Sequence, residues 1–362
     1  NGTGTQNCSG SGGSVIGFEI NKASGTLNFT SNIKFCYSYI HTAGTVNWNS
    51  NKATFAPIGS TTITGSTFYD VEFNTTGNSG TRTLTIATAN MIVTHDLTFT
   101  LFSYFSFAGN NIEARGDIVL NTTGGWGANK IIVNGTGTQN CSGTGGSGMG
   151  FEINKASGTL NFTSNVKFYY NYTYLAGTVN WNTYKATFLP NSSISITGTT
   201  FYDVEFNAGG NSGSNTITIA NTNMTILNNL IVTTMTYFSF GGYDLEVQGN
   251  ATTSVSFYSP IKLIFNGTGT QTLTTSGDNF SSIDVNKSSG VVNLGSNLSL
   301  THYWQNINIL SGTLDLKNYN LTLGGSIKNS GEVKLVGSET ISLGELDNSD
   351  QGIVTYYGTG TY

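Results

Sequence analysis

Short segments in which apolar and polar residues alternate recur along the whole chain. Alternation with a period of two is typical of a half-buried β-strand, whose successive side chains point to opposite faces. In segment 18–21, Phe18 and Ile20 alternate with Glu19 and Asn21. The same order, with an acidic residue two positions before an asparagine, recurs at 69–74, 151–154, 202–207 and 283–286.

Further short strand patterns follow each of these segments, for example at 25–29, 44–48, 52–55 and 61–64. Gly, Asn and Ser separate the patterns at intervals of roughly 8–12 residues, the spacing of an all-β fold. No run places apolar residues at i, i+3, i+4 and i+7 among good helix formers. The chain is therefore predicted to be all-β.

The motif Asn-Gly-Thr-Gly-Thr-Gln divides the chain into copies of one repeat. It stands at 1–6, 134–139 and 266–271, and residues 17–32 recur letter for letter at 150–165. Such self-similarity is the signature of a repeat protein. We expect one continuous solenoid with these divisions: copy 1 at 1–133, copy 2 at 134–265, a shorter copy 3 at 266–356, and the start of a further copy at 357–362. The sequence opens and closes on related motifs, which favours the interpretation that it is a segment of a longer array.

The lengths of the copies favour stacked coils over separate globules. Copy 3 is about 42 residues shorter than copy 1, which matches the loss of two coils of roughly 20 residues each. We expect a right-handed parallel β-helix, or β-solenoid, of about 15–18 turns with inward rows of Ile, Val, Leu and Phe. Tandem β-sandwich domains are the alternative, because they too consist of short strands with regular turns.

Composition narrows the function classes. Only 9% of the 362 residues are charged, whereas Gly numbers 47 and aromatic residues make up 12%, which favours a packed β structure over disorder. The net charge is −5 and no basic block occurs, so binding to nucleic acid is not expected. No window approaches 18 consecutive apolar residues, so this segment is not expected to insert into a membrane.

Several stretches of copy 3 carry a resemblance to a known family. They are Asn-Gly-Thr-Gly-Thr-Gln-Thr-Leu at 266–273, the segment 280–290, and Ser-Gly-Thr-Leu-Asp-Leu-Lys-Asn-Tyr-Asn-Leu-Thr-Leu-Gly-Gly at 311–325. Together they resemble the β-strand-repeat cell-surface proteins of archaea and bacteria, most closely over 266–362. The resemblance implies an adhesin-like or appendage-forming protein at the cell surface, outside the cell. It implies no catalytic residues.

We therefore expect a structural extracellular protein, a subunit or segment of a cell-surface filament, appendage or stalk that self-associates through its β-helix. A carbohydrate-binding surface adhesin is the alternative. A polysaccharide-degrading β-helix enzyme is disfavoured, because such enzymes need acidic residues, alone or with Arg, at one locus. Neither Arg82 nor Arg115 recurs in copy 2, and His95 is replaced there by Asn228. No catalytic, cofactor-binding or metal-ligating residue is expected.

Aromatic and acidic residues supply the candidate contacts. Trp48 and Trp181 hold equivalent places in copies 1 and 2, as do Tyr39 and Tyr172. Such rings suit self-association or glycan stacking if they face outward, although part of the set is expected in the core. The acidic residues could form an outward ladder that recruits Ca²⁺ or the lysines at 22, 155 and 287, but a plain solvated face is favoured.

Asn-x-Ser/Thr tripeptides, the acceptors of N-glycosylation, occur seventeen times, against about 11 expected from composition. Turns and outward strand positions are the best acceptors. The candidate sites are Asn28, Asn74, Asn121, Asn161, Asn171, Asn191, Asn223, Asn250, Asn297 and Asn320.

Overall fold

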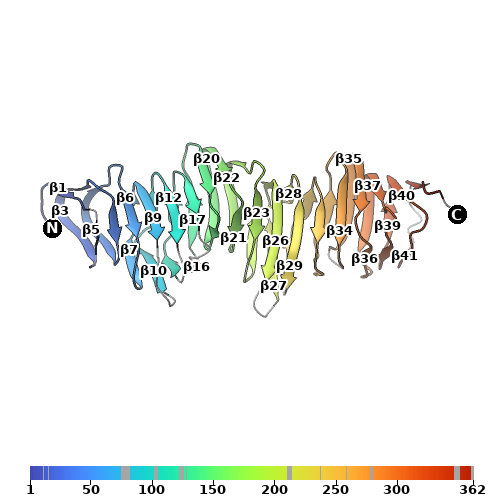
Figure 1. Cartoon of the computed structure of the whole chain (residues 1–362), viewed down its shortest axis with the longest axis horizontal. Helices are drawn as coiled ribbons and strands as arrows, with labels where there is room; N and C mark the ends of the chain where they lie inside the picture. Colours follow the sequence, from blue (N-terminus) through green and yellow to red (C-terminus); the bar gives the residue numbers. More distant parts are fainter. Residues whose placement is uncertain are drawn as a thin grey trace. The chain divides into compact units, whose positions relative to one another are not determined.

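The fold is a parallel β-solenoid (Figure 1). The computed structural model describes residues 1–10, 12–14, 16–74, 82–101, 105–121, 126–127, 129–209, 214–236, 238–257, 259–277, 280–345 and 351–359. Throughout these ranges the regular structure is β-strand, without a helix. The strands form about 15 turns of parallel, stacked coils. The expected β-helix is thus confirmed and the antiparallel sandwich alternative is wrong, while the handedness stays a prediction.

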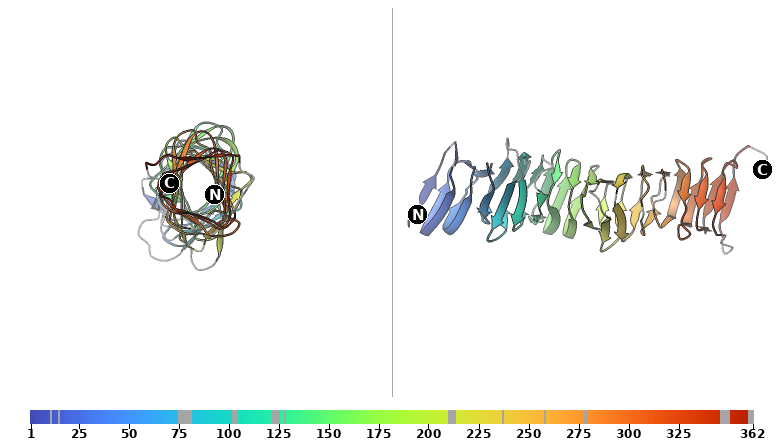
Figure 2. Two further views of the ribbon diagram at one scale, coloured as in Figure 1. Left: turned by 90° about the vertical axis from the view of Figure 1, so that its right-hand side faces the viewer. Right: turned by 90° about the horizontal axis from the view of Figure 1, so that it is seen from below.

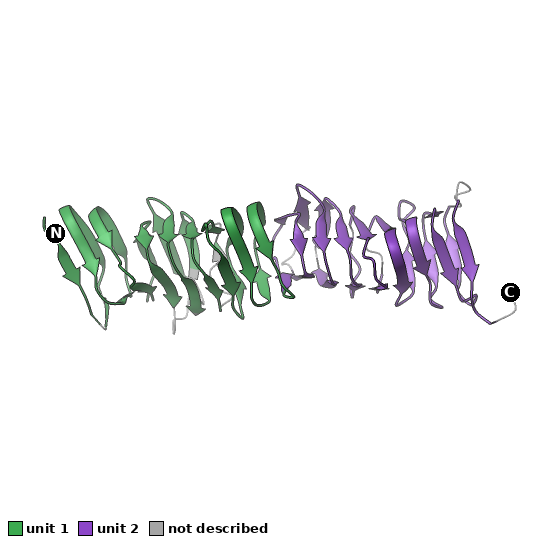
Figure 3. Ribbon diagram, turned by 90° about the horizontal axis from the view of Figure 1, so that it is seen from above, with its two compact units in different colours: residues 1–184 green, residues 185–362 purple. Residues whose placement is uncertain are grey.

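The chain divides into two compact units, residues 1–184 and 185–362 (Figure 3). Their boundary does not coincide with the copies of the sequence repeat. Residues 360–362 of the further copy that we expect at 357–362 lie outside the described part. Because the described residues contain no helix, none is found there with the length and hydropathy to cross a membrane.

The strands of the first unit are β1 (Gln6–Cys8), β2 (Gly13–Ser14), β3 (Phe18–Phe29), β4 (Ile33–Phe35), β5 (Tyr39–Asn47), β6 (Lys52–Phe55), β7 (Thr61–Thr64), β8 (Thr67–Phe68), β9 (Asp70–Asn74), β10 (Arg82–Ala87), β11 (Met91–Val93), β12 (Leu97–Leu101), β13 (Phe105–Gly109), β14 (Ile112–Ala114), β15 (Ile118–Leu120), β16 (Trp126–Gly127), β17 (Lys130–Val133), β18 (Gln139–Ser142), β19 (Gly146–Ser147), β20 (Gly150–Phe162), β21 (Val166–Phe168) and β22 (Tyr172–Asn180).

The strands of the second unit are β23 (Lys185–Phe188), β24 (Ile194–Thr197), β25 (Thr200–Phe201), β26 (Asp203–Gly209), β27 (Asn215–Ala220), β28 (Met224–Ile226), β29 (Leu230–Thr236), β30 (Phe238–Gly242), β31 (Leu245–Val247), β32 (Ala251–Thr253), β33 (Lys262–Phe265), β34 (Gln271–Thr275), β35 (Ser282–Leu294), β36 (Leu298–Leu300), β37 (Asn306–Asp315), β38 (Leu321–Leu323), β39 (Ile327–Asn329), β40 (Glu332–Leu335), β41 (Ile341–Leu343) and β42 (Ile353–Tyr356).

Three strands make one coil, and each pairs with the corresponding strand of the next coil (Figure 2). In the first unit β10, β11 and β12 pair in parallel with β13, β14 and β15. In the second unit β27, β28 and β29 pair in the same way with β30, β31 and β32. Partner residues are separated by one coil of chain, for example 21 residues from Met91 to Ile112 and from Met224 to Leu245. The pleat therefore repeats in register, and like residues stack.

The inward rows fill the interior of each unit. In the first unit Phe35, Phe55, Phe73 and Phe99 stack one above the next, with ring centroids 5.5, 5.8 and 5.1 Å apart. All four rings are buried. A fully buried side chain of this size stabilises the fold by about 1.5–3 kcal/mol, so these rows are a main source of stability. In copy 3 the corresponding row is aliphatic, because Leu300 of β36 lies opposite Leu323 of β38 and both side chains are buried.

Three strands are unusually long because each bends around a corner of its coil. In β20 the first part pairs with β17 and the second part pairs with β18, and the register with β22 shifts between Asn154 and Thr159. The bend therefore falls at residues 155–158. The strands β3 and β35 bend in the same way at the equivalent residues.

Deletion of residues 134–265 is expected to leave a folded, shorter solenoid. The deletion joins β17 to the Asn-Gly-Thr-Gly-Thr-Gln loop of 266–271, which is the same motif that follows β17 in the native chain. Stacked repeats contact mainly their neighbours, so removing whole coils preserves each remaining interface. Far-UV circular dichroism should show a β spectrum with cooperative thermal unfolding.

A deletion of residues 134–255 is the matched control. It joins β17 to the middle of a coil, so that the following strands are out of phase with those already stacked. This variant should lose cooperative unfolding. If both deletions unfolded alike, the modular stacking of coils would be wrong.

Candidate functional site

The repeated Asn-Gly-Thr-Gly-Thr-Gln motif surrounds a buried lysine. The Lys155 ammonium at the bend of β20 donates hydrogen bonds to the carbonyl oxygens of Gly135 (2.5 Å) and Gly137 (3.0 Å) and to Oε1 of Gln139 (2.5 Å). The side-chain amide of Gln139 donates in turn to the carbonyls of Ala114 and Gly116. These donations orient the Gln139 oxygen toward the ammonium. We call this arrangement the lysine cradle.

The lysine cradle occurs once in each copy. Lys22 donates to the Gly4 carbonyl (2.8 Å) and to Oε1 of Gln6 (2.7 Å). Lys287 donates to the carbonyls of Gly267 and Gly269 and to Oε1 of Gln271. The lysine follows the glutamine by 16 residues in all three cases. The Asn-Gly-Thr-Gly-Thr-Gln motif is therefore explained by the stacking of coils.

Glycines let the backbone approach the cradle closely. Gly158 has a φ of +75°, and a Cβ there would lie 2.3 Å from the Gly137 carbonyl oxygen. Gly177 of the next coil lies over the lysine, and a Cβ there would lie 2.7 Å from the Lys155 Cβ. Lys155 is thus enclosed by three successive coils, and the residue is only 1% exposed. Its burial lowers the pKa of Lys155, and burial has the same effect on the pKa of Lys287.

These three lysines do not pair with the acidic ladder, contrary to one of the options suggested by the sequence. The outward acidic residues instead bind lysines of the preceding coil, at N–O distances of 2.5 to 3.2 Å. The pairs are Glu72–Lys52, Glu152–Lys130, Glu205–Lys185 and Asp284–Lys262. Each carboxylate is more buried than its lysine, so the ladder consists of ion pairs between coils.

Asparagine side chains extend the backbone ladder through the turns. The Oδ1 of Asn90 accepts the backbone N–H of Asn111 (3.1 Å), and the Oδ1 of Asn111 accepts the backbone N–H of Lys130 (2.9 Å). In the second unit Asn297 accepts from Asn320, which accepts from Thr340. Each bond joins one coil to the next. The high asparagine content thus has a structural use in addition to any modification.

The candidate glycosylation sites differ in access to Nδ2, the atom that would carry a glycan. Asn28, Asn74, Asn161 and Asn223 are half-buried, and each donates from Nδ2 to a neighbouring side chain. Asn74, which the sequence ranks among the best acceptors, is held by Glu72. Six others are exposed: Asn121, Asn171, Asn191, Asn250, Asn297 and Asn320. Their modification stays a prediction.

The four aromatic residues proposed for self-association or glycan contact lie in the interior, so that prediction is wrong for them. Trp48 and Trp181 are 4% exposed, and Tyr39 and Tyr172 are fully buried. Trp48 stacks on Phe29 with ring centroids 3.9 Å apart. It precedes a turn in which Asn49 has a φ of +51°, and this turn directs the indole inward. Strand alternation alone did not indicate the side on which a residue at a turn would lie.

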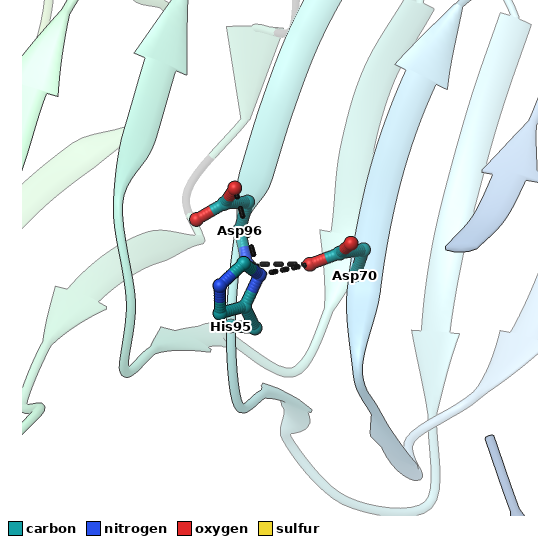
Figure 4. Close-up of side chains that lie close together, drawn as sticks. All are labelled: Asp70, His95 and Asp96. Carbon is teal, nitrogen blue, oxygen red and sulfur yellow. Dashed lines mark hydrogen bonds and ion pairs between the residues drawn. The ribbon is translucent and has the colours of Figure 1, made fainter. Parts of the chain in front are cut away.

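One cluster of titratable groups stands outside the ion-pair ladder (Figure 4). Asp70 opens β9, and His95 and Asp96 lie in the turn between β11 and β12. The Nδ1 of His95 lies 2.7 Å from Oδ1 of Asp70 and 3.5 Å from Oδ2 of Asp96. The backbone N–H of Asp96 donates to the same Asp70 oxygen (2.8 Å). One imidazole and two carboxylates thus meet at the surface.

The charges of this cluster shift its pKa values. The hydrogen bond to Asp70 raises the pKa of His95 above its ordinary value, with Asp96 and Asp117 contributing. Burial raises the pKa of Asp96, and repulsion from Asp70 and Asp117 adds to this effect. The His95 ring also stacks on Tyr69, with centroids 4.7 Å apart.

The second unit contains the same arrangement with asparagines in place of His95 and Asp96. Asn228 Nδ2 and the backbone N–H of Asn229 both donate to Oδ1 of Asp203, at 2.9 and 2.7 Å. Sequence comparison aligned His95 with Asn228 but missed the cluster, because Asp70 lies one coil away. His41 has a structural counterpart as well, since its Nε2 and the Tyr174 hydroxyl each contact the carbonyl of a glycine three residues later.

Comparison with known proteins adds no relative. No protein-family model, no curated protein and no solved structure matches this chain.

Replacing Lys155 with Met should destabilise the protein strongly. Met has a similar length, but it leaves the buried oxygens of Gly135 and Gln139 without their donor, and each buried unsatisfied group costs about 1–3 kcal/mol. We expect the free energy of unfolding to fall by about 2–5 kcal/mol, measured by denaturant titration with circular dichroism. Lys34→Met is the control, because Lys34 is exposed and should change stability by less than about 0.5 kcal/mol. Equal effects would contradict a stabilising cradle.

Acid should weaken the contacts of Glu72. Burial alone would raise its pKa, but hydrogen bonds from Lys52, Thr100 and Asn74 outweigh burial and lower it. A carboxylate with a lowered pKa stabilises the fold above its unfolded pKa, and this stabilisation is lost as the pH falls below about 4.3. Glu72→Gln should therefore flatten the fall of the thermal midpoint in acid. The exposed Glu19→Gln should leave it unchanged, and an unchanged profile in both variants would refute the assignment.

Proposed function

We propose that this chain is a structural protein of the cell exterior, a segment or subunit of a filament, stalk or other appendage that assembles through its coils. The hydrogen bonds and ion pairs that the polar groups of the chain form support this proposal. The repeated lysine, the acidic ladder and the turn asparagines all bond one coil to the next. These groups stabilise a stack of coils.

The observation that carries the proposal is the exposure of apolar side chains on β42 within the described part of the chain. Val354 and Tyr356 pair with Val333 and Leu335 of β40, which are buried, so they belong to the inward rows. Nevertheless Val354 is 53% exposed and Tyr356 is 56% exposed. Apolar inward rows gain stability only when the next coil covers them.

The chain itself shows how such a surface is covered. The equivalent strand β33 is covered by β35, where Leu263 faces Ile283 and Phe265 faces Val285. Both Leu263 and Phe265 are fully buried. The strand β17 is covered by β20 in the same register. A strand of the β20 type is therefore the natural partner of β42.

The first unit offers a strand of this type with a free edge. Residues 18–21 of β3 have the same sequence as 151–154 of β20, yet among the described strands only β5 pairs with them. Phe18 is half-buried, whereas its counterpart Phe151 is 1% exposed. We propose that β3 of a second copy adds to β42, with Phe18 opposite Val354 and Ile20 opposite Tyr356. Backbone pairing would give affinity, and the inward rows would set the register.

A carbohydrate-binding adhesin is the second candidate. A surface hollow of about 180 Å³ lies beside Trp48 and is lined by polar groups and the Tyr69 ring. It is smaller than the roughly 300–1,000 Å³ typical of small-molecule sites, so it favours this candidate less than the edge of β42 favours assembly. Binding of soluble glycans by unassembled protein would support the adhesin instead.

Charged substitutions at either edge should prevent assembly. Val354→Asp and Phe18→Asp each place a carboxylate in the proposed junction, where burial of an unpaired charge is costly. We expect sedimentation velocity to show concentration-dependent multimers for the native chain and monomers for each variant. Thr322→Asp, an outward and exposed position of β38, should assemble like the native chain.

A mixture of the two edge variants provides a directional test. The Phe18→Asp variant keeps an intact β42, and the Val354→Asp variant keeps an intact β3. Mixed together, they should form a single junction and therefore dimers that do not grow. A native chain that stays monomeric, or edge variants that assemble normally, would overturn the proposal.

A further inference from the structure

We propose that Asp70, His95 and Asp96 form a binding site for a divalent transition-metal ion of the Zn²⁺ type. One ligand atom from each residue lies within 4.8 Å of the other two. Ligand atoms on a tetrahedral zinc ion, at about 2.0–2.2 Å from the metal, are roughly 3.3 Å apart. The separation of 3.5 Å between His95 and Asp96 already matches this value. The hydrogen-bonded contact of 2.7 Å between His95 and Asp70 would open as the metal replaces the proton.

The ligands are held by the fold before any ion arrives. The backbone N–H of Asp96 binds the Asp70 carboxylate, and the backbone N–H of His95 donates to the Tyr69 carbonyl (2.9 Å). The His95 ring stacks on the Tyr69 ring with an interplanar angle of 12°. The His95 and Asp96 side chains are 50% and 46% exposed, so an ion can enter and keep water as a further ligand. Three protein ligands with an open position are typical of reactive or exchangeable zinc sites.

The cluster also carries uncompensated negative charge. Among the described residues, no Lys or Arg forms an ion pair with Asp70 or Asp96, whereas Glu72, Glu152, Glu205 and Asp284 each pair with a lysine. Asp117 lies near enough to influence both His95 and Asp96. A divalent cation would supply the missing positive charge.

The second unit provides an independent observation, because it shows what the fold requires at this position. Asp203, Asn228 and Asn229 make the same two hydrogen bonds between coils without an imidazole or a second carboxylate. Stacking therefore explains Asp70, a side-chain donor at position 95 and a side-chain acceptor at position 96, but it requires neither an imidazole nor a second carboxylate there. His95 and Asp96 are residue types that bind transition metals well, whereas amides bind them poorly.

The imidazole decides the class of metal. Nitrogen ligands favour Zn²⁺, Ni²⁺ and Cu²⁺, whereas Ca²⁺ and Mg²⁺ prefer oxygen-only sites. Because Asp70 belongs to one coil and His95 and Asp96 belong to the next, the bound ion would join two coils. An ion that binds the folded chain and not the unfolded chain raises its stability.

The test is calorimetric titration of the full chain with Zn²⁺, compared with the double variant His95→Asn, Asp96→Asn. This variant reproduces the Asn228–Asn229 arrangement, so it should fold and match the thermal midpoint of the native chain in chelator. We expect the native chain to bind one Zn²⁺ and to unfold at higher temperature with Zn²⁺ present. The double variant should bind at least about tenfold more weakly and show no thermal shift, and Ca²⁺ should not compete.

The reverse change supplies a gain-of-function control. Asn228→His with Asn229→Asp rebuilds the cluster in the second unit and should raise the stoichiometry from one zinc ion to two. His41→Tyr, which copies Tyr174, should leave binding unchanged. A native dissociation constant weaker than about 100 µM, or equal binding by the His95→Asn, Asp96→Asn variant, would overturn the proposed site.

Discussion

The hydrogen bonding of a buried ammonium by neutral oxygens is the interaction on which the stack depends. Where β3, β20 and β35 bend, the carbonyls of the glycine-rich loop leave the regular ladder and need other donors, because unpaired buried backbone groups are costly. Lys22, Lys155 and Lys287 each supply such donors from the next coil. Hydrogen bonds from a charged donor are roughly twice as strong as neutral ones. The bend, the loop and the glycine that covers them therefore depend on one another for their structure.

The few charged residues on the outside of the solenoid also bond one coil to the next. Only 9% of the residues are charged, yet four outward carboxylates each bind a lysine of the neighbouring coil. Turn asparagines accept backbone N–H groups in the same direction. Parallel strands leave these positions stacked at one spacing, so polar side chains at equivalent places meet in every coil. The cluster at His95 departs from this scheme, because its carboxylates have no lysine.

The sequence predicts the strands and their parallel stacking, since alternation and exact repeats are local and survive without coordinates. It does not predict which side of a turn a residue occupies, and the prediction for Trp48 is wrong for that reason. It also gives no direct measure of the coil length, so the glutamine of the motif and the lysine sixteen residues later were not paired. The sequence does not predict the contact between Asp70 and His95 for the same reason. The two residues are 25 positions apart, and this separation indicates a contact only once the length of that coil is known.

The parallel ladder also determines how a unit would respond to mechanical force. Its backbone hydrogen bonds run from coil to coil, so tension on one end of the polypeptide peels strands away one after another instead of shearing a whole sheet. Peeling meets little resistance at an ordinary strand of three or four residues. It meets more at each buried lysine, where several charge-assisted bonds and an enclosing glycine must separate together. The regularly placed ammonium groups therefore act as barriers to unravelling, spaced along the chain by the length of one repeat.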